Sequence, residues 1–143
     1  MDSKAAMVIL LAATLALSAC QGHDAAVRDR SKKQVSATER DNGRTITVHR
    51  NDRLVVRLDS TYWTFVRPKT TVLHEVGTPQ TTASPLGTGP GHCTAGTGCG
   101  RVTVTYDAIG PGHAMIAAHR TSCGEAIRCV GDAGTYRLTV KVG

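Results

Sequence analysis

From Arg44 onward, apolar and polar residues alternate along the chain with a period of two, and this pattern limits the fold more than any other feature. In residues 45–49, Ile46 and Val48 alternate with Thr and His. Such alternation predicts a strand with one buried face and one solvated face, as in antiparallel sheets. No helical period follows Cys20. Six further stretches repeat the pattern of two, and these are residues 54–58, 63–66, 71–76, 101–106, 113–119 and 135–142.

Seven short strands over about 100 residues predict an all-β fold, an immunoglobulin-like (Ig-like) β-sandwich of about seven antiparallel strands over residues 44–143. Aromatic residues make up only 3% of the chain, so the core must consist mainly of Val, Leu, Ile and Ala. Trp63, Phe65, Tyr106 and Tyr136 are expected in this core or at its edge. Two long connections, residues 77–100 and 120–133, separate the later strands and are rich in turn-forming residues.

The start of the chain indicates export. Residues 5–19 carry no charge and follow Lys4, and this apolar segment is too short to span a membrane but suits a cleaved signal peptide. Leu17-Ser18-Ala19-Cys20 then resembles the lipobox of bacterial lipoproteins, in which the cysteine receives a diacylglycerol and becomes the first residue. The resemblance implies a signal peptide over residues 1–19, a lipid on Cys20, and a location at the extracytoplasmic face of the cell membrane. An ordinary cleaved signal peptide is the alternative.

The cysteine count agrees with export. There are five cysteines, and setting Cys20 aside leaves an even number, which should be oxidised outside the cytoplasm. Two local disulfides, each between cysteines six residues apart, form the simplest pairing. Crossed pairings that join the two long loops are the alternative. The four cysteines are Cys93, Cys99, Cys123 and Cys129.

Residues 20–43 are polar, mix both charges and show no sustained periodicity, which predicts a flexible stalk after the lipidated cysteine. Its basic cluster over residues 28–33 suits either a solvated spacer or contact with anionic lipid. The chain has a formal net charge of +6, but its basic residues are dispersed and its stacking aromatics are few. Nucleic acid is therefore not an expected partner.

The stretch from Arg101 to His119 contains two strands joined by Ala108-Ile109-Gly110-Pro111-Gly112. This stretch resembles a hairpin of bacterial Ig-like domains and of chagasin-type cysteine-protease inhibitors. The order of elements over residues 45–142 is similar to the inhibitor family throughout. A Tyr-Trp-Thr segment and paired cysteines before the last strand also resemble small actinobacterial lipoproteins.

The inhibitor resemblance implies three binding loops at one end of the sandwich, which enter the cleft of a papain-like protease. The first loop of the family reads Asn-Pro-Thr-Thr-Gly, whereas residues 59–63 here read Asp-Ser-Thr-Tyr-Trp. The second is glycine-rich, and residues 96–100 correspond. The third begins Arg-Pro-Trp, and here only its arginine is present. The candidate binding-loop residues are Ser60, Thr61, Tyr62, Trp63, Gly98, Gly100 and Arg120.

No catalytic motif is present: the chain has neither a Gly-x-Ser-x-Gly elbow nor a His-Glu-x-x-His helix nor a phosphate loop. The prediction is therefore a non-enzymatic, membrane-anchored module that needs no cofactor and binds a protein of the cell envelope. A chagasin-like inhibitor is one alternative. An envelope metal-binding protein is another, because some residues here are soft or borderline ligands, although no metal site is assigned. These residues are His92, Cys93, Cys99, His113, Met115 and His119.

Overall fold

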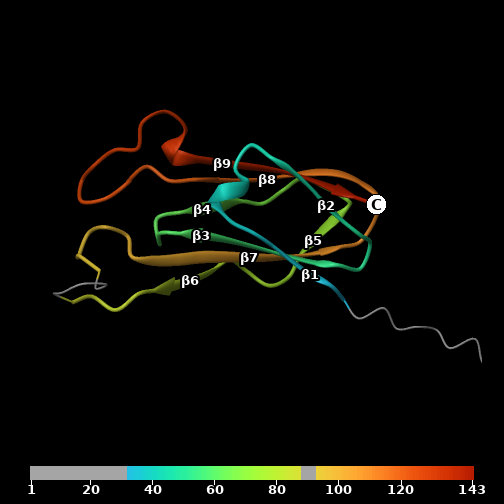
Figure 1. Cartoon of the computed structure of the whole chain (residues 1–143), viewed down its shortest axis with the longest axis horizontal. Coiled ribbons are helices and arrows are strands. Elements are labelled where there is room, and N and C mark those ends of the chain that lie inside the picture. Colours follow the sequence, from blue (N-terminus) through green and yellow to red (C-terminus); the bar gives the residue numbers. More distant parts are fainter. Residues whose placement is uncertain (1–31, 88–92) are drawn as a thin grey trace, which may run out of the picture.

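The computed structural model describes residues 32–87 and 93–143, which form two β-sheets packed face to face (Figure 1). The first sheet contains β1 (Gln34–Ala37), β3 (Arg53–Asp59), β7 (Gly100–Ala108), β5 (Leu73–Glu75) and β6 (Gln80–Ala83). The second sheet has the order β2 (Thr45–Val48), β9 (Thr135–Val142), β8 (Gly112–His119) and β4 (Thr64–Val66). Two short 3₁₀ helices, η1 (Glu39–Asp41) and η2 (Gly131–Gly134), complete the elements.

The predicted Ig-like β-sandwich is confirmed, and each of the seven predicted strands is present. Two additional strands, β1 and β6, bring the number to nine. The expectation of antiparallel pairing throughout is wrong in two places, because β1 pairs parallel with β3 and β2 pairs parallel with β9. Both parallel pairs lie at sheet edges, where a long crossover through the opposite sheet brings the strand to its neighbour.

The structured domain begins earlier than residue 44, the predicted boundary. Strand β1 and helix η1 lie within the segment predicted as a stalk, and Ala37 of β1 is 1% exposed in the core. A capping box starts η1, since the Thr38 hydroxyl accepts from the Arg40 amide and the Asp41 carboxylate accepts from the Thr38 amide. Residues 20–31 of the predicted stalk, which include Cys20, and the predicted signal peptide lie outside the described residues.

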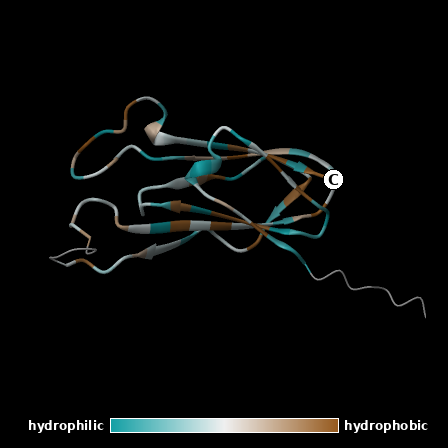
Figure 2. Cartoon of the chain, viewed as in Figure 1, coloured by the Kyte–Doolittle hydropathy of each residue, from teal (hydrophilic) through white to brown (hydrophobic). Residues whose placement is uncertain are grey.

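The core consists of the buried apolar residues of the alternating strands. Figure 2 shows hydrophobic and more hydrophilic residues alternating along β7. In β7, Val102, Val104, Tyr106 and Ala108 point inward, and their sequence neighbours are more exposed. The prediction for the aromatic residues is confirmed. Trp63, Tyr106 and Tyr136 are buried, and Phe65 is partly buried against the same cluster. Among the described residues, no helix is long and apolar enough to cross a membrane.

The hydroxyl groups of Tyr106 and Tyr136 are buried and have no hydrogen-bond partner in the described part of the chain. Burial also raises the pKa of both phenols, because the charged form loses its hydration. A buried, unpaired hydroxyl costs about 1–3 kcal/mol.

Tyr106→Phe is therefore expected to raise the free energy of unfolding by about 1 kcal/mol, because it removes the unpaired oxygen and keeps the ring. Denaturant unfolding measures this change. Tyr62→Phe is the matched control. It should lower the free energy of unfolding, because the Tyr62 hydroxyl donates to a carbonyl oxygen. A stability loss in Tyr106→Phe would show that the hydroxyl has a partner in solution.

Candidate functional site: three loops at one end of the sandwich

Three loops gather at one end of the sandwich, on the left of Figure 1. They connect β3 to β4, β6 to β7 and β8 to β9. Strand register brings them together: Asp59 at the end of β3 pairs with Arg101 at the start of β7, and Ala83 at the end of β6 pairs with Gly100. In the second sheet, His119 at the end of β8 pairs with both Thr64 and Thr135. We call this face the loop end.

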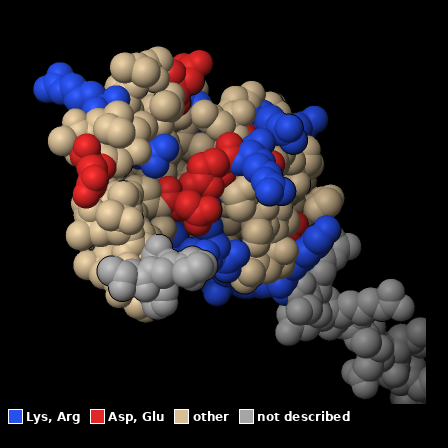
Figure 3. All heavy atoms as spheres, turned by 60° about the vertical axis from the view of Figure 1, so that its left-hand side comes forward, with Lys and Arg blue, Asp and Glu red and all other residues tan. Residues whose placement is uncertain are grey.

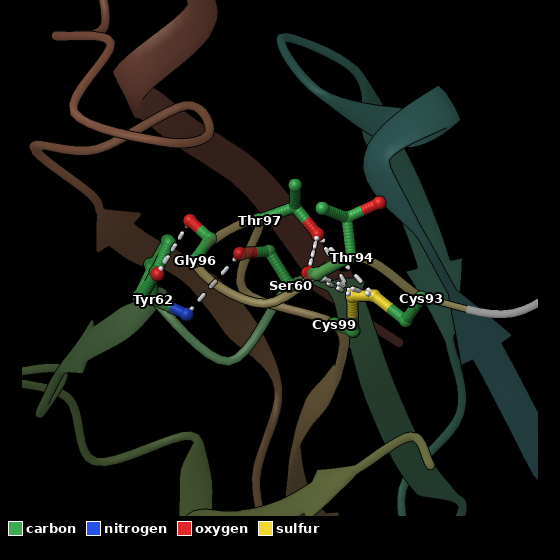
Figure 4. Close-up of a disulfide and its surroundings, with 7 residues drawn as sticks. All are labelled: Ser60, Tyr62, Cys93, Thr94, Gly96, Thr97 and Cys99. Carbon is green, nitrogen blue, oxygen red and sulfur yellow. Dashed lines mark hydrogen bonds between the residues drawn. A yellow bond between two sulfur atoms is a disulfide. The ribbon is translucent and has the colours of Figure 1, made fainter. Parts of the chain in front are cut away.

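The first and second loops are hydrogen-bonded to each other (Figure 4). The Ser60 amide donates to the Gly100 carbonyl at 2.8 Å, and the Thr61 amide donates to the Gly98 carbonyl at 2.7 Å. At the tip, the Tyr62 hydroxyl donates to the Gly96 carbonyl at 2.8 Å. The two loops therefore form one unit, although 34 residues separate Tyr62 from Gly96.

This close approach requires glycine in the second loop. Gly98 has a φ of +70°, and a Cβ added there would lie 2.5 Å from the Tyr62 ring and 2.6 Å from the Ser60 hydroxyl. At Gly100, with a φ of +125°, a Cβ would lie 2.0 Å from the Thr82 carbonyl oxygen. Ser60 itself has a φ of +110°, a conformation that side-chain-bearing residues rarely adopt. Strained backbone of this kind is frequent at functional sites.

Disulfides brace the second and third loops, and the simplest predicted pairing is confirmed: Cys93 bonds to Cys99, and Cys123 bonds to Cys129. Near the first disulfide, the Thr97 hydroxyl lies 2.8 Å from the Cys99 sulfur and donates to the Thr94 carbonyl at 2.7 Å (Figure 4). Each disulfide closes a short local loop, so it stiffens the loop rather than joining the two sheets.

Trp63 and Arg120 join the third loop to the first. The Arg120 guanidinium carbon lies 4.5 Å from the centre of the Trp63 ring, and its Nε donates to the Ala133 carbonyl at 3.1 Å. The Trp63 indole N–H donates to the Asp59 carbonyl at 3.1 Å. A guanidinium over an indole face is a favourable cation–π contact. All three loops are therefore held in one arrangement.

The predicted binding-loop residues fall into two groups. Ser60, Trp63 and Gly98 are buried, so they support the loop end from beneath. Thr61, Tyr62, Gly100 and Arg120 are partly exposed. For Trp63 the expectation of a binding contact is wrong: the side chain is 6% exposed, because it packs into the core below Arg120.

Three exposed apolar residues of this end were not predicted from the sequence. Ile127 and Val130, in the third loop, are 63% and 80% exposed, and Leu86, in the second, is 64% exposed. Ile127 lies inside the short loop that Cys123 and Cys129 close, and Val130 follows Cys129 directly. Apolar residues there are a detectable sequence signal, because such loops are usually polar. These exposed side chains are accessible for contact with a partner.

Both signs of charge occur at the loop end. Figure 3 shows a group of acidic side chains near the middle of the view, with basic side chains on several sides of it and further acidic side chains nearer the margin. The Glu39 carboxylate accepts from the Asp59 amide, which joins η1 to the first loop. Asp59 is exposed and lies 3.9 Å from Arg101. A groove of about 550 Å³ lies beside this contact, lined by Thr38, Glu39, Arg40, Asp59 and Arg120.

The candidate metal ligands are not brought together. Cys93 and Cys99 are in a disulfide, and His113 and His119 lie at opposite ends of β8. Within residues 32–87 and 93–143, no three His, Cys, Asp or Glu side chains are placed to hold a metal ion. His92 lies outside the described residues.

The chain was also compared with known proteins. No protein-family model matches it, and no curated protein matches it by sequence. Solved structures do match. The cysteine protease inhibitor EhICP2 from Entamoeba histolytica superposes with a TM-score of 0.54 at 11% identity, over 79% of this chain and 98% of that chain. This chain therefore shares the fold of that structure.

The solution structure of amebosin also superposes on this chain, with a TM-score of 0.50 at 19% identity, over 78% of this chain and 98% of that chain. The resemblance to the chagasin-type scaffold is thus confirmed at the level of the fold. The coverage shows that almost the whole length of each matched structure is represented here.

Proposed function

We propose that this chain inhibits papain-like cysteine proteases, that it does so without catalysis, and that a lipid on Cys20 holds it at the extracytoplasmic face of a membrane. The sequence predicted a general protein-binding module, and the proposal takes the inhibitor alternative in its place. One observation carries the proposal: three loops meet at one end of an inhibitor fold and are fixed to one another.

Constrained loops favour tight binding, because little conformational entropy remains to be lost on association. Here the constraint comes from the backbone bonds between the first two loops, from two disulfides and from the Trp63–Arg120 contact. A fixed set of loops suits a protease cleft, because such a cleft is largely preformed.

The contact residues proposed for the protease differ from the inhibitor-family motifs. Thr61 and Tyr62 form the tip of the first loop, where the family has Pro-Thr-Thr. In the third loop, the exposed Ile127 and Val130 would supply the apolar contact that the family's Pro-Trp provides. Tyr62 offers contact area at a low entropy cost, because its hydroxyl is already bonded to Gly96.

An inhibition assay tests the proposal. The purified full chain is titrated against papain and, as a control, against the serine protease trypsin. We expect inhibition of papain with a constant below about 1 μM, since protease–inhibitor interfaces are among the tightest of their size. Trypsin should remain active. Papain activity that is unchanged at about 100-fold higher concentration would contradict the proposal.

Cys20→Ala is expected to release the protein from the membrane fraction of its native host. Two or three acyl chains give a lasting anchor, because each buried methylene contributes about 0.8 kcal/mol. Membrane fractionation with immunodetection measures the distribution. Cys123→Ser/Cys129→Ser is a control that should leave the distribution unchanged. Full retention of Cys20→Ala in the membrane would exclude the proposed anchor.

A further inference from the structure

The end of the sandwich opposite the loop end is rich in basic residues, and we call it the basic end. Its parts are hydrogen-bonded together: the Arg53 amide donates to the Lys33 carbonyl at 2.9 Å, and the Arg50 amide donates to the Gly143 carbonyl at 3.0 Å. All four lysines of the described residues lie here or in the adjoining connection from β4 to β5. The cations of this end are Lys32, Lys33, Arg50, Arg53, Lys69 and Lys141.

Few acidic groups oppose these cations. Asp107 is bonded to Arg53 and Lys32, and these contacts, led by the Arg53 hydrogen bond, lower its pKa. Asp52 is buried and accepts the His49 amide at 2.9 Å. In the described part of the chain, four exposed cations have no carboxylate within 4.0 Å: Lys33, Arg50, Lys69 and Lys141.

The loop end differs, because arginines alternate there with Glu39, Asp59, Glu125 and Asp132. The excess positive charge of the domain is therefore concentrated at the basic end. An apolar side chain is exposed there as well: Ile109, in the turn between β7 and β8, is 46% exposed. Lysines can contact the anionic headgroups of a lipid bilayer, and an exposed isoleucine can contact the apolar region beneath them. This combination favours an anionic lipid surface.

The length of chain between Cys20 and the basic end would place the basic end near such a surface. The described part begins at Lys32, at the basic end, and Cys20 lies twelve residues earlier. Twelve residues span at most about 40 Å when fully extended. A lipid on Cys20 would therefore keep the basic end close to the bilayer.

We propose that the basic end docks on an anionic lipid surface and so holds the loop end pointing away from the membrane. This inference rests on the proposed anchor at Cys20. The loops would then be presented to a protease that approaches from the side away from the bilayer. In a neutral bilayer, by contrast, the domain would turn freely on its tether.

Energy transfer from the single tryptophan tests the docking. The acylated full chain is reconstituted in vesicles of phosphatidylcholine alone and in vesicles that also contain phosphatidylglycerol, each with a dansyl headgroup acceptor. Trp63 lies at the loop end, and the nine residues of β7 place it about 30 Å from the basic end. We expect lower transfer in the anionic vesicles, and high salt should abolish the difference.

Two matched variants locate the surface. Lys69→Glu/Lys141→Glu should lower the ratio of docked to free domain by at least about 25-fold and restore the transfer seen in neutral vesicles. Arg128→Glu/Arg137→Glu makes the same change in net charge near the loop end and should keep the low transfer. Vesicle flotation shows whether the protein is bound to each kind of vesicle. If the protein floats with both kinds and the energy transfer is equal in both, the docking proposal is overturned. Protein that floats with neither would instead contradict the anchor.

Discussion

Trp63→Ala is expected to lower the free energy of unfolding by about 3–5 kcal/mol. The side chain is 6% exposed and packs in the core, so its removal leaves a large cavity. It also carries two tertiary contacts, a hydrogen bond from the indole to the Asp59 carbonyl and the stacking of Arg120. Denaturant unfolding followed by circular dichroism measures the loss.

Two matched variants separate these contributions. Trp63→Phe keeps most of the buried volume, so it should lower the free energy of unfolding much less than Trp63→Ala does. Arg120→Ala removes only the cation–π partner and the bond to Ala133, and should cost about 1 kcal/mol. A loss below about 1 kcal/mol in Trp63→Ala would contradict the assignment of Trp63 as a buried support beneath the loop end.

Gly98→Ala is expected to weaken inhibition of papain at least about tenfold, which corresponds to about 1.4 kcal/mol of binding free energy. The added methyl group would meet the Tyr62 ring and the Ser60 hydroxyl, so the first two loops must move apart. The methyl group also disfavours the positive φ by about 1–2 kcal/mol. Progress curves with a fluorogenic peptide give the inhibition constant.

Gly77→Ala is the matched control for this variant. Gly77 has a φ of +74°, close to the +70° of Gly98, but a Cβ there would meet nothing within 4 Å. Gly77→Ala should lower the free energy of unfolding by an amount similar to Gly98→Ala. It should still inhibit papain with the constant of the unmodified chain. If both variants inhibit papain as the unmodified chain does, the packing of the two loops is irrelevant to binding.

Most of the fold was predictable because the core strands alternate without interruption. β7 and β9 show this best, since every second residue of each is buried. β1 and β6 were missed for physical reasons. In β6 all four residues, Gln-Thr-Thr-Ala, are exposed, so the strand has no apolar face to detect. In β1 only Ala37 is fully buried, and its polar surroundings look like a spacer.

The candidate site was predictable in part. The loop positions and the two local disulfides follow from the order of strands and cysteines. The contacts between loops do not, because they join residues far apart in sequence: Tyr62 with Gly96, and Trp63 with Arg120. Nor did alternation reveal that Ile127 would be exposed. Packing in three dimensions decides those outcomes, and a period-two pattern carries no information about it.

The central claim is that the loop end binds the protease, and hydrogen exchange on the complex with papain tests it most directly. The account predicts slower exchange at amides in residues 59–63, 94–100 and 120–134 when papain is present. Amides of the turns at the basic end, residues 49–52 and 109–111, should exchange as in the free chain. Protection confined to the basic end or to the outer face of a sheet would contradict the claim.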